Sequence, residues 1–573
     1  MLRTHTCGEL RKKDLGKTVT LAGWLHSIRS HGKLFFIDLR DRYGLTQCVI
    51  NAEKDFEFYK SLKKESVLLI KGKVQERISG QKNKDMLTGD IELKISKLDV
   101  LTKSEQTPFK VEDDVIANED LRLKYRYLDL RRTPVKKAII TRHKVVKAIR
   151  DYLDNYDFLE IETPFLGKST PEGARDFLVP SRVHPGKFYA LPQSPQIYKQ
   201  LFMVSGLDKY FQIVRCFRDE DLRADRQNEF TQMDLEMSFL EEEDIYKMIE
   251  GMMASIWQKV HKVKIKTPFL RMTYKESMER FGVDAPDMRF KNELQDYKDF
   301  FKKCGFNILE SAKNVKGIKF KGSLDKKQLK KVESEAKRFK AKGMISLTNN
   351  NGIEGPIAKF LNKETLAKLE KEIKKGETLL LVGDDNRHIV NESLGKVRNL
   401  IGDIFNLKGK EFKFCWVTKF PLFELNEEGR VTSVHHPFTS PQPDHLKFLE
   451  DKPLEVLSVA YDLVINGTEI GGGSIRIHDP EIQQRIFKVL GLTDERIKIN
   501  FGFLTEAFKY GAPPHGGIAL GVDRLVAMIA DKPSLRDVIA FPKTKDAEGL
   551  LEGTPTLVTK DQLDELHISS KKK

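Results

Sequence analysis

The chain has 573 residues, of which 40% are hydrophobic and 32% charged, and its formal net charge is +15. This length is too great for one hydrophobic core, so we expect about two to four domains. The sequence lacks an apolar run near the roughly 20 residues of a membrane span, an N-terminal signal core, and a CxxC pair or Cys/His cluster of metal-ligand spacing. We therefore expect a soluble cytoplasmic protein without a membrane partner, whose positive charge favours polyanions such as nucleic acids.

The N-terminal segment, residues 1–107, is predicted to form a small β-barrel of the OB type. Short alternating runs separated by Gly-containing turns are typical of this barrel. Aromatic and cationic side chains on its surface would make a stacking platform for unpaired bases, although one of Phe35 and Phe36 must face the core because adjacent strand residues point in opposite directions. The runs are 19–25, 34–40, 47–50, 67–74 and 91–95, and the platform residues are Arg29, His31, Lys33 and Phe36.

A charged connector at 108–133 leads to a predicted helix that begins near Thr133, with Pro134 in its first turn. A strand that ends at Pro164 follows. On periodicity alone we interpret the helix as an ordinary core helix. A long helix followed by a strand stopped by proline would also suit a subunit interface.

A dense loop of Arg, Asp and Glu joins an apolar run at 210–217 to an alternating run that starts at Glu229, which predicts two antiparallel strands. Arg218 at the mouth of the loop is of the residue type that binds phosphate oxygens bidentately. We favour a binding surface over a solvated hairpin because the polar face continues into the second strand. Alternation places Phe230, Gln232, Asp234 and Glu236 on this face, and Met233, Leu235 and Met237 on the other.

Residues from about 285 to 410 are lysine-dense and carry short apolar runs such as 378–383. We interpret them as an inserted α+β domain, because richer chemistry resumes on both sides.

The Asn-Gly pair at 466–467 between β-rich runs predicts a hairpin with a type I′ turn. Regular pairing sets Asp462 against Gly471 and makes Asp462 and Glu469 diagonal neighbours on one face. Two carboxylates this close suit a shared Mg²⁺ that holds phosphate oxygens, and a solvated acidic face is the alternative. Simple alternation sends Arg476 to the opposite face, so a bulge among the three glycines from 471 onward would be needed to bring it into the same site.

A glycine-rich turn, a short strand and a helix are expected over 511–528. Arg524 lies at the start of that helix, where amide donors and a cation together favour anions. The chain has neither GxxxxGK[ST] nor GxGxxG after a strand. A phosphate-handling enzyme without these loops needs another fold.

Together these segments resemble the class II aminoacyl-tRNA synthetases. The hairpin at 210–237 is similar to motif 2 of the family, Gly521 to Arg524 to motif 3, and the helix and strand ending at Pro164 to motif 1, the dimer element. The finer resemblance, over nearly the whole chain, is to bacterial-type aspartyl-tRNA synthetase (subclass IIb), although Gly383-Asp384-Asp385 departs from the Gly-Ala-Asp of the family's inserted domain. It rests on the motifs at 171–177, 193–196, 217–220, 435–438 and 471–476.

The resemblance implies a multidomain α/β fold. An OB-fold anticodon-binding barrel (1–107) and a hinge (108–133) would precede a class II antiparallel-sheet catalytic domain flanked by helices. That domain would comprise residues 134–284 and 411–573, with a basic tail, and the inserted α+β domain would occupy 285–410.

The resemblance also implies the reaction. The α-carboxylate of L-aspartate attacks the α-phosphorus of ATP, and the acyl group of the aspartyl-adenylate then passes to the 3′-OH of the terminal adenosine of tRNA-Asp. Catalysis in a cytoplasmic homodimer would rest on positioning and charge neutralisation, with Mg²⁺ accompanying ATP. The implied catalytic residues are Arg218, Glu469 and Arg524; ATP would also meet Asp219, Glu220, Gln227, Phe230, Gly521, Val522 and Asp523, and Mg²⁺ would bind Asp462 and Glu469.

Amino-acid choice is expected to follow from charge. Lys199 and Arg476 match the family's clamp on the side-chain carboxylate, so asparagine would leave two cations unpaired, which costs on the order of 10⁴ in selectivity. Arg218 would hold the reacting carboxylate, and Glu172 would receive the α-ammonium. The supporting residues are Gln196, Asp234, His435 and His436.

In the barrel, Phe36 matches the family's anticodon-stacking phenylalanine, with Arg29 and Gln47 as base-reading partners. His31 stands where some members that charge only tRNA-Asp have leucine, and it resembles members that also charge tRNA-Asn. Our hypothesis is therefore relaxed tRNA choice.

Two other functions are weighed against this one. A nucleic-acid-binding module with an inactive synthetase-like domain would have lost phosphate ligands, yet Arg218, Glu469 and Arg524 are all present. An asparaginyl- or lysyl-type relative is disfavoured by Lys199 with Arg476, which suit a carboxylate side chain.

Overall fold

The structure is a computed structural model that describes residues 1–78, 80–170 and 173–571. The chain divides into two compact units, 1–139 with 539–556 and 140–538 with 557–573. From the sequence, residues 539–556 are expected in the catalytic domain, within 411–573, whereas the structure groups them with residues 1–139. Among the described residues, no helix is long and apolar enough to cross a membrane.

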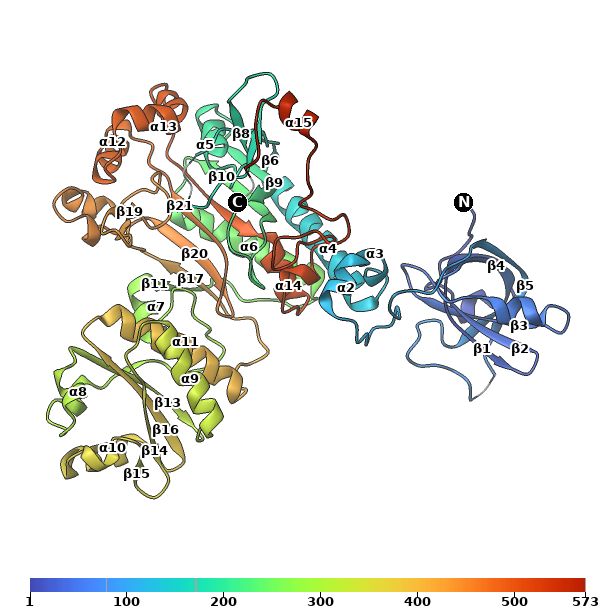
Figure 1. Cartoon of the computed structure of the whole chain (residues 1–573), viewed down its shortest axis with the longest axis horizontal. Coiled ribbons are helices and arrows are strands. Elements are labelled where there is room, and N and C mark those ends of the chain that lie inside the picture. The colour runs from blue at the N-terminus through green and yellow to red at the C-terminus, as the bar shows by residue number, and fades with distance from the viewer. Residues whose placement is uncertain (79, 171–172, 572–573) are drawn as a thin grey trace. The chain divides into compact units, whose positions relative to one another are not determined.

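The first unit contains the predicted OB-type barrel, drawn in blue in Figure 1. In β2, Phe35, Ile37 and Leu39 are buried while Phe36 lies half-buried on the outer face, which resolves the choice between the two phenylalanines. The barrel closes in the order β1-β2-β3-β5-β4 from β1 (Thr18–His31), β2 (Leu34–Arg40), β3 (Leu45–Asn51), β4 (Val67–Glu76) and β5 (Ile91–Thr102), with η1 (Lys12–Asp14) and α1 (Phe56–Ser61) beside it.

The connector is helical, with α2 (Glu119–Lys124) and α3 (Arg126–Asp129) before the long helix α4 (Thr133–Asp154). The buried Arg126 side chain donates from Nη2 to the Ile539 carbonyl and from Nε to the Ala540 carbonyl, both at 2.9 Å. A buried guanidinium needs such partners. These bonds attach the segment 539–556 to the first unit.

The second unit is built on an eight-stranded sheet of order β11-β17-β20-β21-β22-β10-β9-β6. Among the described strands of this sheet, only the outermost pairs, β11 with β17 and β6 with β9, are parallel. The predicted class II antiparallel sheet is therefore confirmed. The strands are β6 (Leu159–Glu160), β9 (Lys209–Phe217), β10 (Glu229–Ser238), β11 (Leu270–Thr273), β17 (Phe414–Thr418), β20 (Ala460–Ile465), β21 (Thr468–Ile475) and β22 (His515–Gly521).

Helices and short strands surround this sheet. One hydrophobic cluster joins Ile197 of α5 to Phe487 of α12 and to Phe501 of α13. The helices are α5 (Gln196–Val204), α6 (Glu242–Val260), α7 (Tyr274–Phe281), α12 (Pro480–Val489), α13 (Asp494–Phe508), α14 (Val522–Ile529) and α15 (Lys560–Glu565), with η4 (Pro443–Phe448), η5 (Pro453–Glu455), η6 (Leu535–Asp537) and the two-stranded pairs β7 (Leu178–Pro180) with β8 (Phe188–Ala190) and β18 (Phe423–Leu425) with β19 (Val431–Ser433).

The segment between α7 and β17 forms a five-stranded sheet of order β12-β13-β16-β14-β15. Both faces of its central strand are covered, because Leu380 and Val382 pack under α9 and α11 while Leu379 and Leu381 pack on the opposite side. Burial on both faces explains the continuous apolar run. The elements are β12 (Gln295–Asp296), β13 (Asn314–Lys321), β14 (Ile345–Asn349), β15 (Ile353–Glu354), β16 (Glu377–Asp384), α8 (Asn307–Ser311), α9 (Lys326–Arg338), α10 (Lys363–Glu372), α11 (Arg387–Ile404), η2 (Lys298–Phe301) and η3 (Ala358–Phe360).

Glu279 of α7 ties this inserted sheet to the catalytic sheet's flank. Its carboxylate accepts hydrogen bonds from Lys316 Nζ of β13 at 2.6 Å and from Arg387 Nε of α11 at 2.7 Å. Burial alone would raise the pKa of Glu279, but the two cations outweigh it and lower that pKa to about 2.

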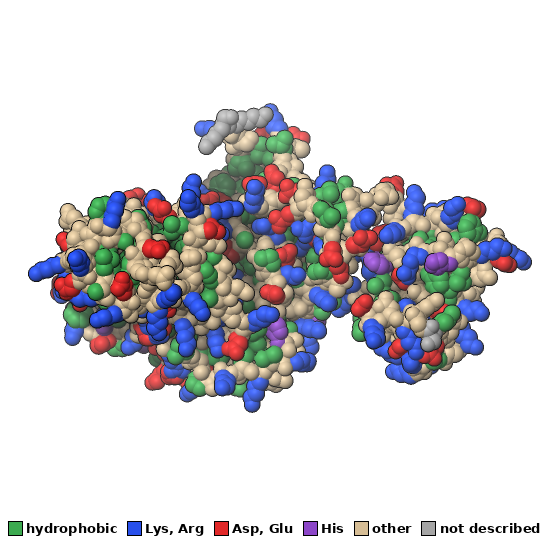
Figure 2. Space-filling view, turned by 90° about the horizontal axis from the view of Figure 1, so that it is seen from below, with side chains coloured by type: hydrophobic (Ala, Val, Ile, Leu, Met, Phe, Trp, Pro, Cys, Tyr) green, Lys and Arg blue, Asp and Glu red, His purple; other side chains and the backbone are tan. Residues whose placement is uncertain are grey.

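Charged side chains are dispersed over the surface: in Figure 2, Lys and Arg side chains are spread over the visible face among acidic ones.

Candidate active site

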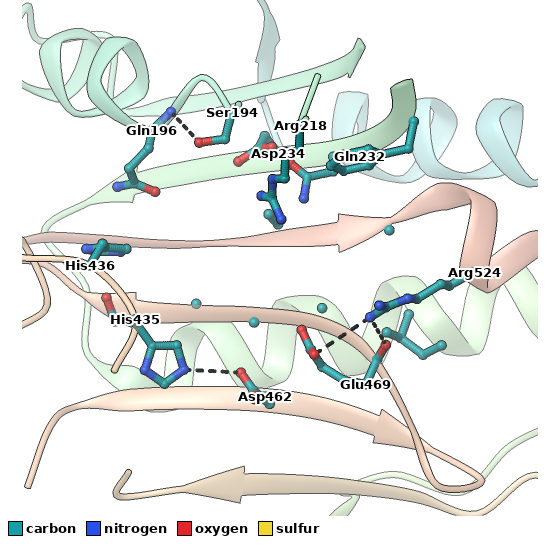
Figure 3. A pocket seen from close by; sticks show the side chains of 18 of the residues that line it. Ser194, Gln196, Arg218, Gln232, Asp234, His435, His436, Asp462, Glu469 and Arg524 are labelled. Atoms are coloured by element: carbon teal, nitrogen blue, oxygen red, sulfur yellow. Dashed lines mark hydrogen bonds and ion pairs between the residues drawn. The ribbon is translucent and has the colours of Figure 1, made fainter. Parts of the chain in front are cut away.

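A cavity of about 630 Å³ opens over strands β9, β10, β20, β21 and β22 of the large sheet. Figure 3 shows Arg218 and Asp234 on one side of it and Asp462, Glu469 and Arg524 on the other. These residues are far apart in the sequence, and the strand order alone brings them together. Of the predicted site residues, the lining includes Arg218, Glu220, Gln227, Phe230, Glu469, Gly521, Asp523, Arg524, Gln196, Lys199, Asp234, His435, His436, Arg476 and Asp462.

The half of the cavity expected to hold ATP contains Arg218 and Arg524. The Cζ atom of Arg218 lies 5.1 Å from the centroid of the Phe230 ring, within cation–π distance. Arg524 donates to the Glu469 backbone carbonyl at 3.1 Å, and its Nη1 lies 3.7 Å from Glu469 Oε2. Arg524 is thus held at the edge of the sheet while part of its side chain, 28%, remains exposed.

In the hairpin of β20 and β21, the strand register agrees with the prediction at the turn but differs from it further along the strands. Ile465 pairs with Thr468 as predicted, but Asp462 lies opposite Gly472, so the predicted pairing of Asp462 with Gly471 is wrong. The register shifts because one extra residue, Ile470, bulges out of β21 between Glu469 and Gly471. Turn chemistry sets register only as far as the first irregularity.

This bulge brings Arg476 to the same side as Glu469. After one extra residue, the even-numbered positions Gly472, Ser474 and Arg476 take over the face that Glu469 occupies, and all of them line the cavity. The side chains agree, since Arg476 Nη1 donates to Ser474 Oγ at 2.7 Å. A Cβ atom on Gly472 would lie 2.4 Å from Asp462 Oδ1.

Asp462 and Glu469 form a carboxylate pair beside His435. His435 Nε2 lies 3.8 Å from Asp462 Oδ1, and this interaction raises the pKa of His435, against the lowering effect of burial. Enclosure in the pocket and the charge of Asp462 raise the pKa of Glu469 to about 7, even though 47% of the side chain is exposed to the cavity. Two carboxylates that repel each other in this way fit Mg²⁺, which binds one or two carboxylates together with substrate phosphates.

The closed end of the cavity contains a buried network of four charged residues. Lys199 Nζ lies 2.9 Å from Asp234 Oδ1 and 3.2 Å from Glu236 Oε2. Arg476 Nε donates to Glu236 Oε1 at 3.0 Å. Burial would raise the pKa of Glu236, but Arg476 and Lys199 outweigh it and lower that pKa.

This network corrects the expected basis of amino-acid choice. Lys199 and Arg476 each have a carboxylate partner already, so asparagine would not leave two unpaired cations there. Lysine and arginine side chains can donate hydrogen bonds but cannot accept them, so any further partner at these positions must be an acceptor. The expectation of two unpaired cations therefore does not hold in this structure.

Buried polar atoms without partners also line the cavity. Among the described residues, these are Gln196 Nε2, Asp234 Oδ2 and His435 Nδ1. Such atoms are rare in folded proteins unless a ligand or water satisfies them. Nearby, burial and Arg476 lower the pKa of His436 well below its usual range, so its neutral ring accepts from Arg476 Nη1 at 2.5 Å.

Some predicted site residues do not line the cavity or do not face it freely. Val522 is fully buried, and Asp219 lies outside the lining, with its backbone amide bonded to the Arg175 carbonyl at 3.0 Å. The carboxylate of Asp523 is engaged by Arg142 and by the Thr231 amide. Glu172 falls outside the described residues.

Other lining residues were not predicted as site residues, among them Ser194, Gln232, Asp284 and Ser474. The resemblance at 193–196 pointed to Ser194, and the alternation along β10 pointed to Gln232. Asp284 carried none, because it enters the pocket from a loop after α7.

The predicted anticodon residues gather on the outer face of the barrel in the first unit. The His31 and Phe36 rings lie 6.1 Å apart, edge to face. Arg29 Nη2 lies 3.1 Å from Asp38 Oδ2 and 3.5 Å from Gln47 Oε1, while Gln47 Nε2 donates to Glu92 Oε2 at 2.9 Å. Phe36 and Arg29 are therefore accessible, and Gln47 lies beneath them, 7% exposed.

Comparisons with known proteins agree with this architecture. Residues 118–545 match the family described as tRNA synthetases class II (D, K and N), and residues 19–101 match the OB-fold nucleic acid binding domain. The aspartate–tRNA(Asp/Asn) ligase of Caldanaerobacter subterraneus subsp. tengcongensis is 51% identical, over 99% of this chain and 98% of that protein. The aspartate–tRNA ligase of Shouchella clausii is 49% identical, over 99% of both chains.

Solved structures of the same fold are more distant in sequence. The asparaginyl-tRNA synthetase of Pyrococcus horikoshii, complexed with asparaginyl-adenylate, gives a TM-score of 0.60 at 20% identity and covers 95% of this chain and 99% of that one. The aspartyl-tRNA synthetase of Entamoeba histolytica gives 0.58 at 19% identity, over 93% and 90%. At this identity the likeness concerns the fold alone.

Proposed function

Since the chain belongs to the bacterial aspartate–tRNA ligases of the class II tRNA synthetase family, we propose that its pocket binds ATP and L-aspartate side by side and joins them as aspartyl-adenylate. The acyl group then passes to the 3′ end of tRNA-Asp. One observation carries the assignment of the pocket. Cationic side chains from four separate segments line a single cavity, among them Lys199, Arg218, Arg476 and Arg524.

In the proposed first step, Arg218 binds the α-phosphate of ATP and the attacking α-carboxylate of aspartate. A guanidinium between two anions brings them together and offsets their repulsion. Phe230, next to Arg218 in space, stacks on the adenine. Arg524 binds the far end of the triphosphate, so ATP is fixed at both ends while the nucleophile approaches.

Asp462 and Glu469 hold the Mg²⁺ that accompanies ATP, and this ion supplies charge neutralisation on the phosphate oxygens. The two side chains face one another across Gly472, whose lack of a side chain leaves room between them. This closeness supports the assignment, and burial together with the charge of Asp462 raises the pKa of Glu469, so a cation between the two carboxylates would stabilise them.

In the proposed aspartate subsite, Lys199 and Arg476 donate to the side-chain carboxylate of the substrate. Asparagine presents an amide N–H₂ in the same place, and donors would then face donors. A site built from fixed donors rejects a ligand with the wrong hydrogen-bond pattern strongly, because its buried groups are left unsatisfied. The unpartnered Asp234 Oδ2 supports a companion role for Asp234, accepting from the α-ammonium.

Pyrophosphate exchange with ATP, run separately with aspartate, asparagine and lysine, tests this function. We expect exchange with aspartate only. Exchange with asparagine alone would contradict the proposed subsite, and no exchange with any of the three would favour a nucleic-acid-binding module.

Replacing Arg218 by lysine keeps the charge and loses the bidentate geometry, and should slow exchange on the order of 10²-fold. Arg223→Lys, in the same loop but outside the lining, is the matched control.

We further propose that the enzyme charges tRNA-Asn as well as tRNA-Asp. His31 lies edge-on to Phe36 on the outer barrel face, where it would contact the anticodon. Relatives named for both tRNAs and for tRNA-Asp alone are about equally similar to this chain, so identity does not decide the matter. Aminoacylation assays with purified tRNA-Asp and tRNA-Asn transcripts test this proposal. Negligible charging of tRNA-Asn contradicts it. The variant His31→Leu should lower the rate of tRNA-Asn charging at least about tenfold and leave tRNA-Asp charging unchanged.

We also propose a homodimer, supported by the resemblance of α4 and β6 to the family's dimer element. Sedimentation equilibrium of the full chain tests this. A single species of monomer mass at micromolar concentration would contradict it.

A further inference from the structure

Arg142 on α4 does not line the cavity but contacts two elements that do. Its Nη1 atom pairs with Asp523 Oδ1 at the start of α14, and its Nη2 atom donates to Thr231 Oγ1 of β10 at 2.8 Å. The third side of the triangle is closed by the Thr231 amide, which donates to Asp523 Oδ2 at 2.8 Å. Three elements that are distant in sequence are therefore bonded pairwise.

The position of these three contacts matters because two of the residues, Asp523 and Thr231, are each next in sequence to a proposed ATP ligand. Asp523 immediately precedes Arg524, and Thr231 immediately follows Phe230. Phe230 and Arg524 lie on separate elements, and the Asp523–Thr231 hydrogen bond joins the two elements at the wall of the cavity. The spacing between the adenine platform and the triphosphate clamp depends on this contact.

The Asp523 carboxylate is not available to ATP. Asp523 is 2% exposed, and each of its oxygens already accepts a hydrogen bond. A buried carboxylate keeps its charge only with a cationic or multiple N–H partner. Arg142 supplies the cation, and Thr231 Oγ1 has a second donor in Arg215 Nη1 at 3.3 Å. Loss of Arg142 therefore leaves Asp523, rather than Thr231, without compensation.

We propose that Arg142 is a positioning residue for ATP, which acts through Asp523 and Thr231 to fix Arg524 relative to Phe230. This inference rests on the proposed function of the pocket. Without the guanidinium, the Asp523 carboxylate must find water or another donor, and the start of α14 shifts away from β10. The aspartate subsite, built on Lys199 and Arg476, does not contact the triangle and stays intact.

The variants to compare are Arg142→Ala and Arg142→Lys in the full-length enzyme, by pyrophosphate exchange at varied ATP and at varied aspartate. We expect Arg142→Ala to raise the KM for ATP about tenfold or more and to leave the KM for aspartate within about twofold. Lysine offers one point donor in place of a fork and should recover only part of the loss. Arg150→Ala, on the same helix with a 48% exposed side chain paired to Glu160, is the matched control.

Chemical rescue separates positioning from a merely structural role. Millimolar guanidinium should lower the KM for ATP of Arg142→Ala and leave the wild type unchanged, while methylammonium should do less. A general loss of folding would lower the active fraction and affect both substrates equally, and guanidinium would not reverse it. Thr231→Val, which keeps the backbone bond to Asp523, should fold in any case and raise the KM for ATP by a smaller factor.

Equal effects on both substrates, or a folded Arg142→Ala with an unchanged KM for ATP, would overturn the inference. The wild-type assay is independent of it. If the wild type itself shows no aspartate-dependent exchange, the proposed function fails; if the wild type is active and only the variant pattern is absent, the positioning role fails.

Discussion

Gly472 faces Asp462 so closely that a methyl group in its place would lie 2.4 Å from the Asp462 Oδ1 atom and 3.8 Å from Glu469 Oε1. Real Cβ atoms do not approach an oxygen this closely, so Gly472→Ala must displace the Asp462 carboxylate. We expect pyrophosphate exchange to fall on the order of 10²-fold, with a higher Mg²⁺ requirement. Gly343→Ala, where no atom lies within 4 Å of the added methyl, is the control. Wild-type exchange in Gly472→Ala would show that this carboxylate pair does not serve ATP.

Lys199→Met should affect both aspartate binding and stability. The Lys199 side chain is 1% exposed and lies between Asp234 and Glu236, so its loss leaves buried carboxylates with less compensation. Breaking such a buried pair costs about 3–5 kcal/mol in unfolding free energy. The KM for aspartate should rise on the order of 10²-fold, with little change in the KM for ATP. Urea unfolding and substrate-varied exchange measure the two effects, and Lys147→Met, at a 65% exposed position, should show neither.

The attachment of the inserted domain should weaken in acid through Glu279. Its folded pKa is about 2, below the ordinary 4.5, because Arg387 and Lys316 outweigh burial. A depressed folded pKa means that the contribution is fully present above 4.5 and is lost as the pH falls from 4.5 towards 2. We expect Glu279→Gln to cost about 1 kcal/mol at neutral pH, since the pair is partly exposed. Urea unfolding of both proteins, at neutral pH and within that window, should show this difference shrinking; a constant difference would contradict it.

Phe36→Ala should weaken tRNA binding without affecting adenylate formation. A base stacked on an aromatic ring contributes about 1–3 kcal/mol, so the KM for tRNA should rise about tenfold or more. Pyrophosphate exchange without tRNA should be unchanged, because Phe36 lies in the first unit and does not line the cavity. Phe58→Ala, another exposed aromatic of the same unit, is the control, and an equal loss there would argue against a specific stacking role.

Local patterns in the sequence predicted much of the fold. The alternation after Glu229 indicated a strand with a polar face, and the structure has that strand as β10, with Met233 and Leu235 fully buried on the other side. In the inserted domain, the run at 378–383 predicted the class of the domain but not the strand order. Strand order depends on contacts between segments far apart in the sequence, which short apolar runs do not specify.

The errors at the site have the same origin. The sequence required a bulge among the glycines from 471 onward to bring Arg476 into the site, and the structure places the bulge one residue earlier, at Ile470, an ordinary strand residue by type. The carboxylate of Asp523 is bonded to Arg142, which is 381 positions away in the chain, so local sequence could not show this contact. The pairing of Lys199 and Arg476 with Glu236 likewise requires α5, β10 and the end of β21 to meet, which only the folded sheet provides.

The single extra residue at Ile470 shifts the alternation of side chains along β21 by one position. Glu469 before it and Ser474 and Arg476 after it share one face, so one short segment carries both an anionic site at Glu469 and a cationic one at Arg476. If Ile470 were paired like an ordinary strand residue, the alternation would gain one step: every residue would keep its identity, yet Glu469 and Arg476 would point to opposite faces of the sheet. In this strand, the count of residues matters as much as their kind.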